Sequence, residues 1–203
     1  MRTATWVTGL AILLALATRS TADDKTGLDN DGFIQKWLVL APIPFADGDS
    51  GNDSFKKPQI KDEAKLKPKA GEKVKVGKQE LTWKKHTSKG HMLDFNAVLG
   101  NETEDSVGYA VTYITVPQEM KAVRMKTGSD DHLRVYLNGK EAFKYEDERA
   151  GDKDQDTTEV TLRKGVNVLV AKVVNVKADW ELCVRFMDKD DKPLKGLQAK
   201  TEE

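Results

Sequence analysis

The chain has 203 residues, of which 38% are hydrophobic and 33% are charged, with 33 basic and 33 acidic residues. A formal net charge of zero excludes a bulk positive field that would hold nucleic acid or an anionic membrane, and it argues against disorder. The length fits one domain with a core of its own, and the single cysteine cannot form an internal disulfide.

The N-terminus has the pattern of a secretory signal peptide. Arg2 precedes an apolar stretch from Trp6 to Ala17, and small residues follow up to Ala22. The stretch is shorter than the roughly 20 residues of a spanning helix, so we expect cleavage after Ala22 and no membrane span in the mature chain. Export without disulfides is typical of bacterial proteins. We therefore expect a periplasmic or extracellular protein.

The first half of the mature chain predicts short strands separated by loops. Residues 36–41 form the first expected strand, which Pro42 and Pro44 end because proline cannot donate to a ladder. Residues 59–66 are compatible with two helical turns before Pro68. Further strands are expected at residues 72–76, 80–84 and 92–95.

The second half has clearer strand patterns. Both faces of residues 109–116 are apolar, which predicts a central strand, and residues 120–127 follow it. Segments 133–137 and 140–145 flank Asn138-Gly139, the strongest hairpin signal in the chain. Three more strands are expected at residues 159–162, at residues 166–174 with both faces buried, and at residues 180–187 with Trp180, Leu182, Val184 and Phe186 inward.

The ends of the mature chain are polar and lack apolar periodicity. The predicted organisation is therefore a signal peptide (1–22), a polar tail (23–32), one domain (33–187) and a charged C-terminal tail (188–203). Many short expected strands without a long helix predict an all-β fold, a β-sandwich. Cys183 lies within an apolar strand, so we expect a small buried hydrophobe and not a catalytic thiol.

Four segments carry a family resemblance, namely residues 37–44, 81–83, 128–140 and 164–170. In this order they resemble the galactose-binding-like jelly-roll domains of secreted bacterial proteins. The resemblance extends to the non-catalytic sandwich domains attached to glycoside hydrolases and carbohydrate esterases. It implies a jelly roll over most of the domain and a carbohydrate ligand. Relatives often have a small residue, typically glycine, where this chain has His132.

Aromatic and charged side chains suggest where a sugar would bind. Arg134 and Tyr136 are offset by one from the core positions of their strand, so they should point away from the core. Tyr145 and Tyr113 are expected on the same sheet face, where exposed rings would stack on a pyranose. The alternative is that these tyrosines cover the sheet or lie under loops.

Two groups of aspartates are candidate metal ligands. The protective-antigen lectin domain has an Asp-Asp pair for calcium-dependent sugar binding, and the corresponding pair here would be Asp130 and Asp131. A structural role, in which Asp130 accepts backbone N–H bonds before the hairpin, is the alternative. The spacing of the first three ligands in a calcium loop is matched by Asp152, Asp154 and Asp156. Thr157 and Arg163 then replace the glycine and glutamate of that motif, which favours a solvated acidic loop. Structural calcium is the one cofactor left open.

The sequence has no motif that predicts an enzyme. It lacks a Gly-x-Ser-x-Gly elbow and a His-Glu-x-x-His pair, and His86 and His91 are expected to be exposed loop residues. We therefore expect a secreted non-catalytic module that binds a carbohydrate or a cell-envelope glycan. The alternative is a structural scaffold of the envelope with a protein partner and no sugar.

Overall fold

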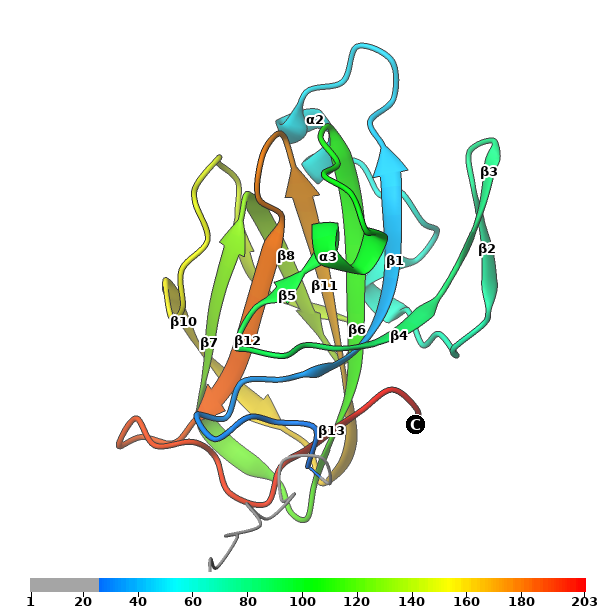
Figure 1. Ribbon diagram of the computed structural model, residues 1–203. Coiled ribbons are helices and arrows are strands. Elements are labelled where there is room, and N and C mark those ends of the chain that lie inside the picture. Colours follow the sequence, from blue (N-terminus) through cyan, green and yellow to red (C-terminus); the bar gives the residue numbers. More distant parts are fainter. Residues whose placement is uncertain (1–25) are drawn as a thin grey trace, which may run out of the picture.

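A computed structural model describes residues 26–203, in which two antiparallel β-sheets pack face to face (Figure 1). The predicted signal peptide lies outside the described residues. The larger sheet has seven strands, ordered β4-β1-β6-β11-β8-β9, with β13 also pairing β6. Its bounds are β1 Lys36–Pro44, β4 Lys84–Thr87, β6 Ser106–Val116, β8 His132–Leu137, β9 Lys140–Tyr145, β11 Gly165–Asn175 and β13 Gln198–Lys200. This architecture confirms the all-β prediction.

The smaller sheet and a separate hairpin complete the strands. The smaller sheet has the order β10-β7-β12-β5, with β5 Leu93–Asp94, β7 Met120–Asp130, β10 Asp156–Leu162 and β12 Glu181–Met187. The hairpin pairs β2 (Lys73–Val76) with β3 (Gln79–Thr82) and projects from one side of the sandwich (Figure 1). The helices are short: α2 Gly51–Lys56, α3 Phe95–Leu99 and a 3-10 turn at Glu63–Lys65. Among the described residues, no helix is long and apolar enough to cross a membrane.

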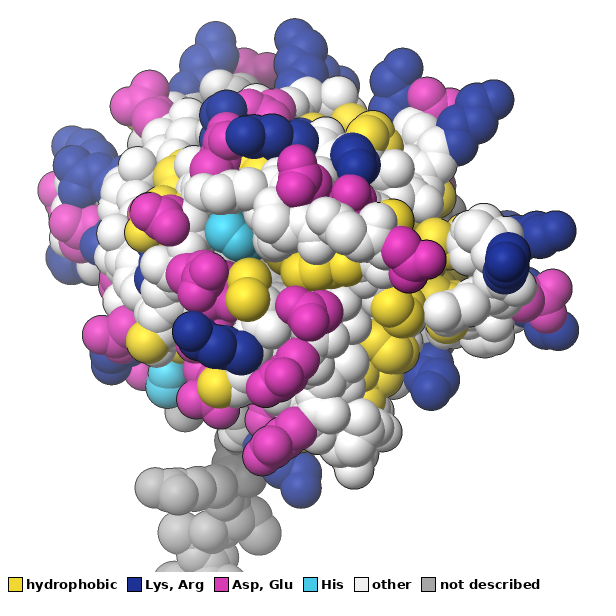
Figure 2. All heavy atoms as spheres, turned by 90° about the horizontal axis from the view of Figure 1, so that it is seen from above, with side chains coloured by type: hydrophobic (Ala, Val, Ile, Leu, Met, Phe, Trp, Pro, Cys, Tyr) yellow, Lys and Arg dark blue, Asp and Glu magenta, His cyan; other side chains and the backbone are white. Residues whose placement is uncertain are grey.

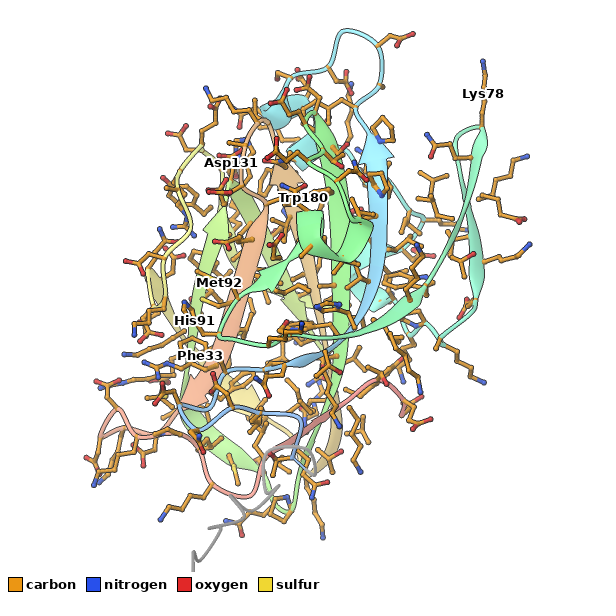
Figure 3. All side chains as sticks on the ribbon, in the orientation of Figure 1. Phe33, Lys78, His91, Met92, Asp131 and Trp180 are labelled. Carbon is orange, nitrogen blue, oxygen red and sulfur yellow. The ribbon has the colours of Figure 1, made fainter. Side chains whose placement is uncertain are left out.

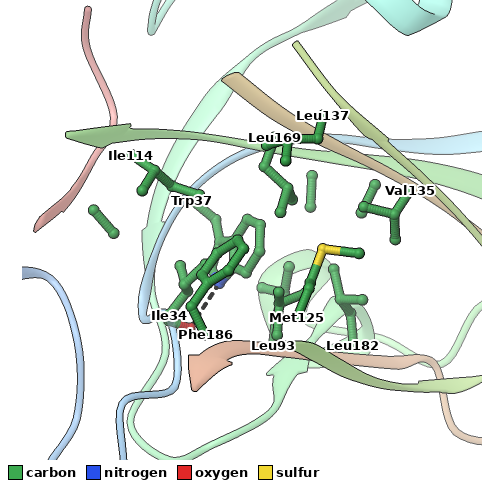
Figure 4. Packing of buried hydrophobic residues seen from close by; sticks show 14 of the residues in the cluster. Ile34, Trp37, Leu93, Ile114, Met125, Val135, Leu137, Leu169, Leu182 and Phe186 are labelled. Carbon is green, nitrogen blue, oxygen red and sulfur yellow. Dashed lines mark hydrogen bonds between the residues drawn. The ribbon is translucent and has the colours of Figure 1, made fainter. Parts of the chain in front are cut away.

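The main core lies between the two sheets (Figure 4). Alternate residues of each strand enter it, because successive side chains of a strand point to opposite faces. The predicted inward set of β12 is confirmed, since all four of its members are buried there: Trp180, Leu182, Val184 and Phe186. Trp37 of β1 also enters this core, and its indole nitrogen donates a hydrogen bond to the Ile34 carbonyl at 3.1 Å.

A second core covers the opposite face of the larger sheet. The segment between β1 and β4 folds over this face, and Phe55 and Trp83 from that segment are fully buried. Outward residues of β6 and β11 complete this core: Tyr109, Val111, Tyr113, Val168, Val170 and Val174. The prediction that these two strands are central and apolar on both faces is thus confirmed, because a covering segment buries the second face.

Two local predictions in the first half are wrong. Residues 59–66 form only a single 3-10 turn, whereas the longer helix α2 begins earlier, at Gly51, with Ser50 as its N-cap. Ser50 and Asp53 form a capping box, in which each side chain accepts a hydrogen bond from the other residue's backbone N–H. The first strand does not end at Pro42, because a register shift between Leu40 and Ile43 lets β1 continue to Pro44.

The predicted tails are also corrected. Strand β13 lies beside β6, where Ala199 pairs with Ile114, and Leu197 and Ala199 are buried in the main core. At the other end Leu28 pairs with Ile34. These contacts could not be predicted from the sequence, because charged residues surround them and a three-residue strand with one inward side chain shows no apolar periodicity. The described domain therefore spans residues 26–203.

Candidate functional site

The predicted sugar platform is buried. Tyr136 and Tyr113 do share one face of the larger sheet, but the covering segment lies over both, and they are 7% and 2% exposed. The Tyr136 hydroxyl donates to Glu63 Oε1 at 2.8 Å, and the Tyr113 hydroxyl donates to the Pro68 carbonyl at 2.7 Å. No ring face is free for a pyranose, so the alternative of tyrosines under loops describes this structure.

Arg134 shares the outward face of β8 with Tyr136, as predicted, and lies under the covering segment, whereas Tyr145 is on the other face. Arg134 stacks over the Phe55 ring at 4.3 Å and lies 3.4 Å from Glu141. Tyr145 is opposite Leu133, which belongs to the main core, so the prediction that Tyr145 shares the face of Tyr136 is wrong. A register shift between β8 and β9 accounts for the change of face, and the Arg149 guanidinium covers the Tyr145 ring at 3.9 Å.

The same face holds a buried polar network that sequence reasoning missed. Glu63 accepts hydrogen bonds from Tyr109 and Tyr136 and lies 3.5 Å from the ammonium group of Lys172, which is fully buried. Lys172 also donates to the carbonyls of Phe55 and Lys57, at 3.0 and 2.6 Å. The sequence does contain a sign of this network, because Lys172 lies inside an apolar run that is expected to be buried on both faces, where a lysine needs hydrogen-bond partners. The network fastens the covering segment to the sheet.

Burial changes the acidity of this network. It lowers the pKa of Lys172 from 10.5 to about 8, although Glu63 opposes the change. Burial also raises the pKa of Tyr109 well above its usual value, and Glu63 adds to the effect by repelling a phenolate. The neighbouring Tyr136 has its pKa raised to about 12 for the same two reasons. The tyrosines therefore stay protonated and serve as hydrogen-bond donors.

The Asp-Asp pair has a structural role at the loop between β7 and β8. Asp130 accepts a hydrogen bond from the Gly151 N–H at 3.1 Å, a backbone donor that lies after the hairpin. Asp131 accepts from the Arg149 and Val176 N–H groups, at 3.3 and 2.8 Å. These bonds join three loops at one end of the sandwich. The next residue, His132, is buried against Phe55, with ring centroids 5.8 Å apart.

The predicted calcium ligands do not converge. Asp154 pairs with Arg185, and Asp156 accepts two hydrogen bonds from Arg149, at 2.6 and 3.2 Å. Asp152 contributes its carbonyl, which accepts a contact from Cys183 Sγ at 3.8 Å. Within residues 26–203, no group of three or more His, Cys, Asp or Glu side chains is arranged to hold a metal ion. Asp154 and Asp156 are therefore each paired with an arginine side chain.

The largest pocket of the described residues lies beside β5, and we refer to it as the β5 pocket. It encloses about 600 Å³ between the β4–β5 connection, α3 and the loop that contains Gly151. Figure 3 shows His91 and Met92 at this side of the molecule, next to Phe33, and the His91 and Phe33 rings lie 5.6 Å apart. The polar side chains of the lining are His86, Thr87, Ser88, Lys89, His91, Asp94, Asp152 and Glu181.

Two features of the β5 pocket favour a polar ligand. Asp94 and Glu181 lie directly opposite each other on β5 and β12, and burial followed by the Asp94 charge raises the pKa of Glu181. Asp94 caps α3 by accepting from the Ala97 N–H at 2.9 Å. The Ser88 hydroxyl is 4% exposed and has no hydrogen-bond partner in the structure. The Glu181 carboxyl, for which no hydrogen bond is found among the described residues, is therefore the lining group best placed to accept a hydrogen bond from a ligand.

No local pattern in the sequence indicates this pocket. Its two carboxylates meet only because β5 pairs with β12, which lies far along the chain. His86 is a strand residue of β4 and is half-buried, and this burial lowers its pKa. His91 is exposed, as expected. The prediction of two solvent-exposed loop histidines thus holds for one of them.

A shallower hollow adjoins the β5 pocket through the same loop. Its lining includes Asp130, Asp131, Glu148 and Asp179, together with Arg149 and Lys177. Burial and the Asp131 charge raise the pKa of Asp130 to about 6, and burial also raises the pKa of Asp131. Perturbed carboxylates gather at functional sites, and here they gather at one end of the sandwich.

Comparison with known proteins leaves the family open. The sequence matches no model of a known protein family, and it matches no curated protein. The site must therefore be judged from its own geometry.

Proposed function

We propose that this protein is an exported, non-catalytic module of the galactose-binding-like jelly-roll type that binds a carbohydrate in the β5 pocket. The observation that carries the proposal is the polar lining of this pocket, to which Asp94 and Glu181 contribute carboxyl groups and Thr87 a hydroxyl group. Carboxylates and hydroxyls orient sugar hydroxyls, and a volume of about 600 Å³ falls within the usual range of small-molecule sites. The resemblance of the chain to sugar-binding sandwiches supports the same class of ligand.

Two observations favour this function over its competitors. Val166 is the only exposed large hydrophobic residue among those described, and a protein-docking scaffold would need an apolar interface core. A thiol-dependent enzyme is disfavoured because Cys183 is buried, which raises its pKa to about 12. A non-catalytic module that binds a polar ligand in a polar pocket agrees with both the scarcity of exposed apolar residues and the burial of Cys183.

The experiment is a thermal-unfolding screen of residues 23–203 against neutral mono- and oligosaccharides. A ligand that binds only the native state raises the midpoint by mass action. For the sugar that does so, Glu181→Gln should weaken binding roughly tenfold, because it removes a charged acceptor. The variant should fold, since it relieves the repulsion between Glu181 and Asp94.

The matched control is Glu159→Gln, an exposed glutamate of β10 outside the pocket. It should leave sugar binding unchanged. If no sugar gives a saturable shift at millimolar concentration, or if Glu181→Gln binds as the wild type does, the proposal is wrong.

A further inference from the structure

The net charge of zero conceals a strong separation of charge along the chain. Residues 56–89 contain twelve lysines, no arginine and four acidic residues, a formal charge of +8. All twelve lysines are exposed. Three of them form ion pairs with carboxylates, Lys57 with Asp49, Lys67 with Glu203 and Lys73 with Glu80. The charge of the other nine faces solvent.

The β2–β3 hairpin presents part of this charge away from the body of the protein. Val74 and Leu81 are opposite each other and half-buried, and they pack against the second core. Lys73 and Lys75 are exposed on the other side of β2, about 7 Å apart by the rise of a strand. Lys78 lies at the tip (Figure 3). The apolar side fixes the hairpin, and on the exposed side Glu80 pairs with Lys73 and lies opposite Lys75.

Strand β4 continues the basic surface. Lys84 and Lys85 follow Trp83, which is buried and whose N–H donates to the Glu72 carbonyl at 2.9 Å. Lys84 and Lys85 are consecutive, so they point to opposite sides of β4. We refer to the five exposed lysines of β2, β4 and the turn together as the lysine face: Lys73, Lys75, Lys78, Lys84 and Lys85.

Acidic side chains gather at a different place. Residues 146–156 contain six acidic and two basic residues, and residues 101–106 contain three acidic residues and no basic one. These loops lie at the end of the sandwich that faces the viewer in Figure 2, where acidic side chains are prominent, whereas the projection at the right edge carries basic ones. A polyanion is thus repelled from the loop end and attracted to the lysine face.

We propose that the lysine face binds an anionic polysaccharide, one whose sugar units carry carboxylate or sulfate groups. The chemistry of the face favours this class. Lysine is a point charge that attracts anions of any geometry, and residues 56–89 contain no arginine, whose planar fork reads guanine in a DNA duplex. Trp83, the only aromatic residue of that range, is 1% exposed, so no ring can stack on a base.

The same face is unsuited to a membrane. Amphipathic elements that bind lipid insert large apolar side chains beside their lysines. On the hairpin the apolar residues Val74, Val76 and Leu81 pack against the second core, so none is available to enter a bilayer. Spaced single charges on a rigid strand match a chain of regularly spaced single anionic groups.

The test uses polygalacturonate as the probe, with neutral dextran of similar length as its uncharged counterpart. We expect saturable binding of polygalacturonate that weakens as salt rises from about 50 to 200 mM, and no binding of dextran to this face. The triple variant Lys75→Gln, Lys78→Gln, Lys84→Gln should weaken binding roughly tenfold or more and reduce the salt dependence. It should fold, because these lysines are exposed and form no ion pair with a described residue.

The matched control changes the net charge by the same amount elsewhere, with Lys121→Gln, Lys164→Gln and Lys189→Gln, all exposed. It should bind as the wild type does. Equal losses in the two triple variants, no binding of polygalacturonate, or stronger binding to phosphatidylserine vesicles or a DNA duplex would each overturn the proposal. The β5 pocket is not lined by Lys75, Lys78 or Lys84. The outcome of the polygalacturonate test therefore does not depend on the outcome of the sugar screen.

Discussion

Substitution of Lys172 by methionine tests the buried network that holds the covering segment on the larger sheet. The lysine is fully buried in the middle of β11, and its ammonium group contacts two carbonyls and Glu63. Its pKa is lowered in the folded protein, chiefly because burial penalises the charged form. In the unfolded chain this penalty is absent. Folding therefore becomes more favourable as the pH rises and both states lose the proton.

The magnitude follows from the two pKa values. A fall from 10.5 to about 8 corresponds to a penalty of roughly 3 kcal/mol on the charged form. The penalty is present in full below pH 8 and disappears as the pH approaches 10.5, because the unfolded chain binds more protons over this interval. Linkage between pH 7 and pH 10 then gives a gain in stability of roughly 2 to 3 kcal/mol from this one group.

The assay is urea unfolding of the wild type and Lys172→Met at pH 7, 8, 9 and 10. We expect the stability of the wild type to rise by roughly 2 to 3 kcal/mol relative to the variant over this range. The comparison stops at pH 10 because the tyrosines act in the opposite sense above it. The pKa of Tyr136 is raised to about 12, so stability is lost as the pH rises from 10 toward 12.

An exposed lysine provides the control. Lys164→Met lies in a turn, and the stability difference between this variant and the wild type should not change between pH 7 and pH 10. If the difference for Lys172→Met is also constant, to within about 0.5 kcal/mol, then Lys172 has no lowered pKa and the reasoning about the network fails.

Two further predictions concern other buried residues. Leu197→Ala should destabilise the protein by about 2 to 3 kcal/mol in denaturant unfolding, because Leu197 is 3% exposed in the main core. The control substitution Gln198→Ala, at the exposed neighbouring residue, should change stability by less than about 0.5 kcal/mol. Equally small effects of both substitutions would show that the C-terminal segment does not pack against the sandwich. Cys183 should react slowly with a thiol reagent in the native protein and rapidly in urea, because it is 1% exposed and its pKa is raised to about 12; immediate modification of the folded protein would contradict its burial.

The strands with long apolar patterns could be predicted from the sequence. Residues 109–116 and 166–174 were expected to be central because both of their faces are apolar, and β6 and β11 are central. The Asn138-Gly139 turn was expected to connect a hairpin, and it does so with both residues at positive φ. In each case the evidence lies within one segment, so no long-range pairing had to be known.

The covering segment could not be predicted, and the error in the sugar platform follows from this. Tyr113 and Tyr136 were placed correctly on an outward face, but the position of the loop above them depends on contacts between residues far apart. The Glu63 network makes several of these contacts, and a single glutamate in a charged stretch gives no sign of burial. The same limit applies to the β5 pocket, whose two carboxylates are brought together by the pairing of β5 with β12.

Charge shows how averaging over a sequence can mislead. A sum of zero predicts no field that would hold a polyanion, and that prediction treats the molecule as uniform. The fold places a segment of formal charge +8 on the covering loop and hairpin, while the acidic loops lie at the end of the sandwich. Screening over about 8 to 10 Å at physiological salt keeps these regions from cancelling each other across a domain of this size. The local charge of a surface, and not the net charge of the chain, therefore decides which polymers it can bind.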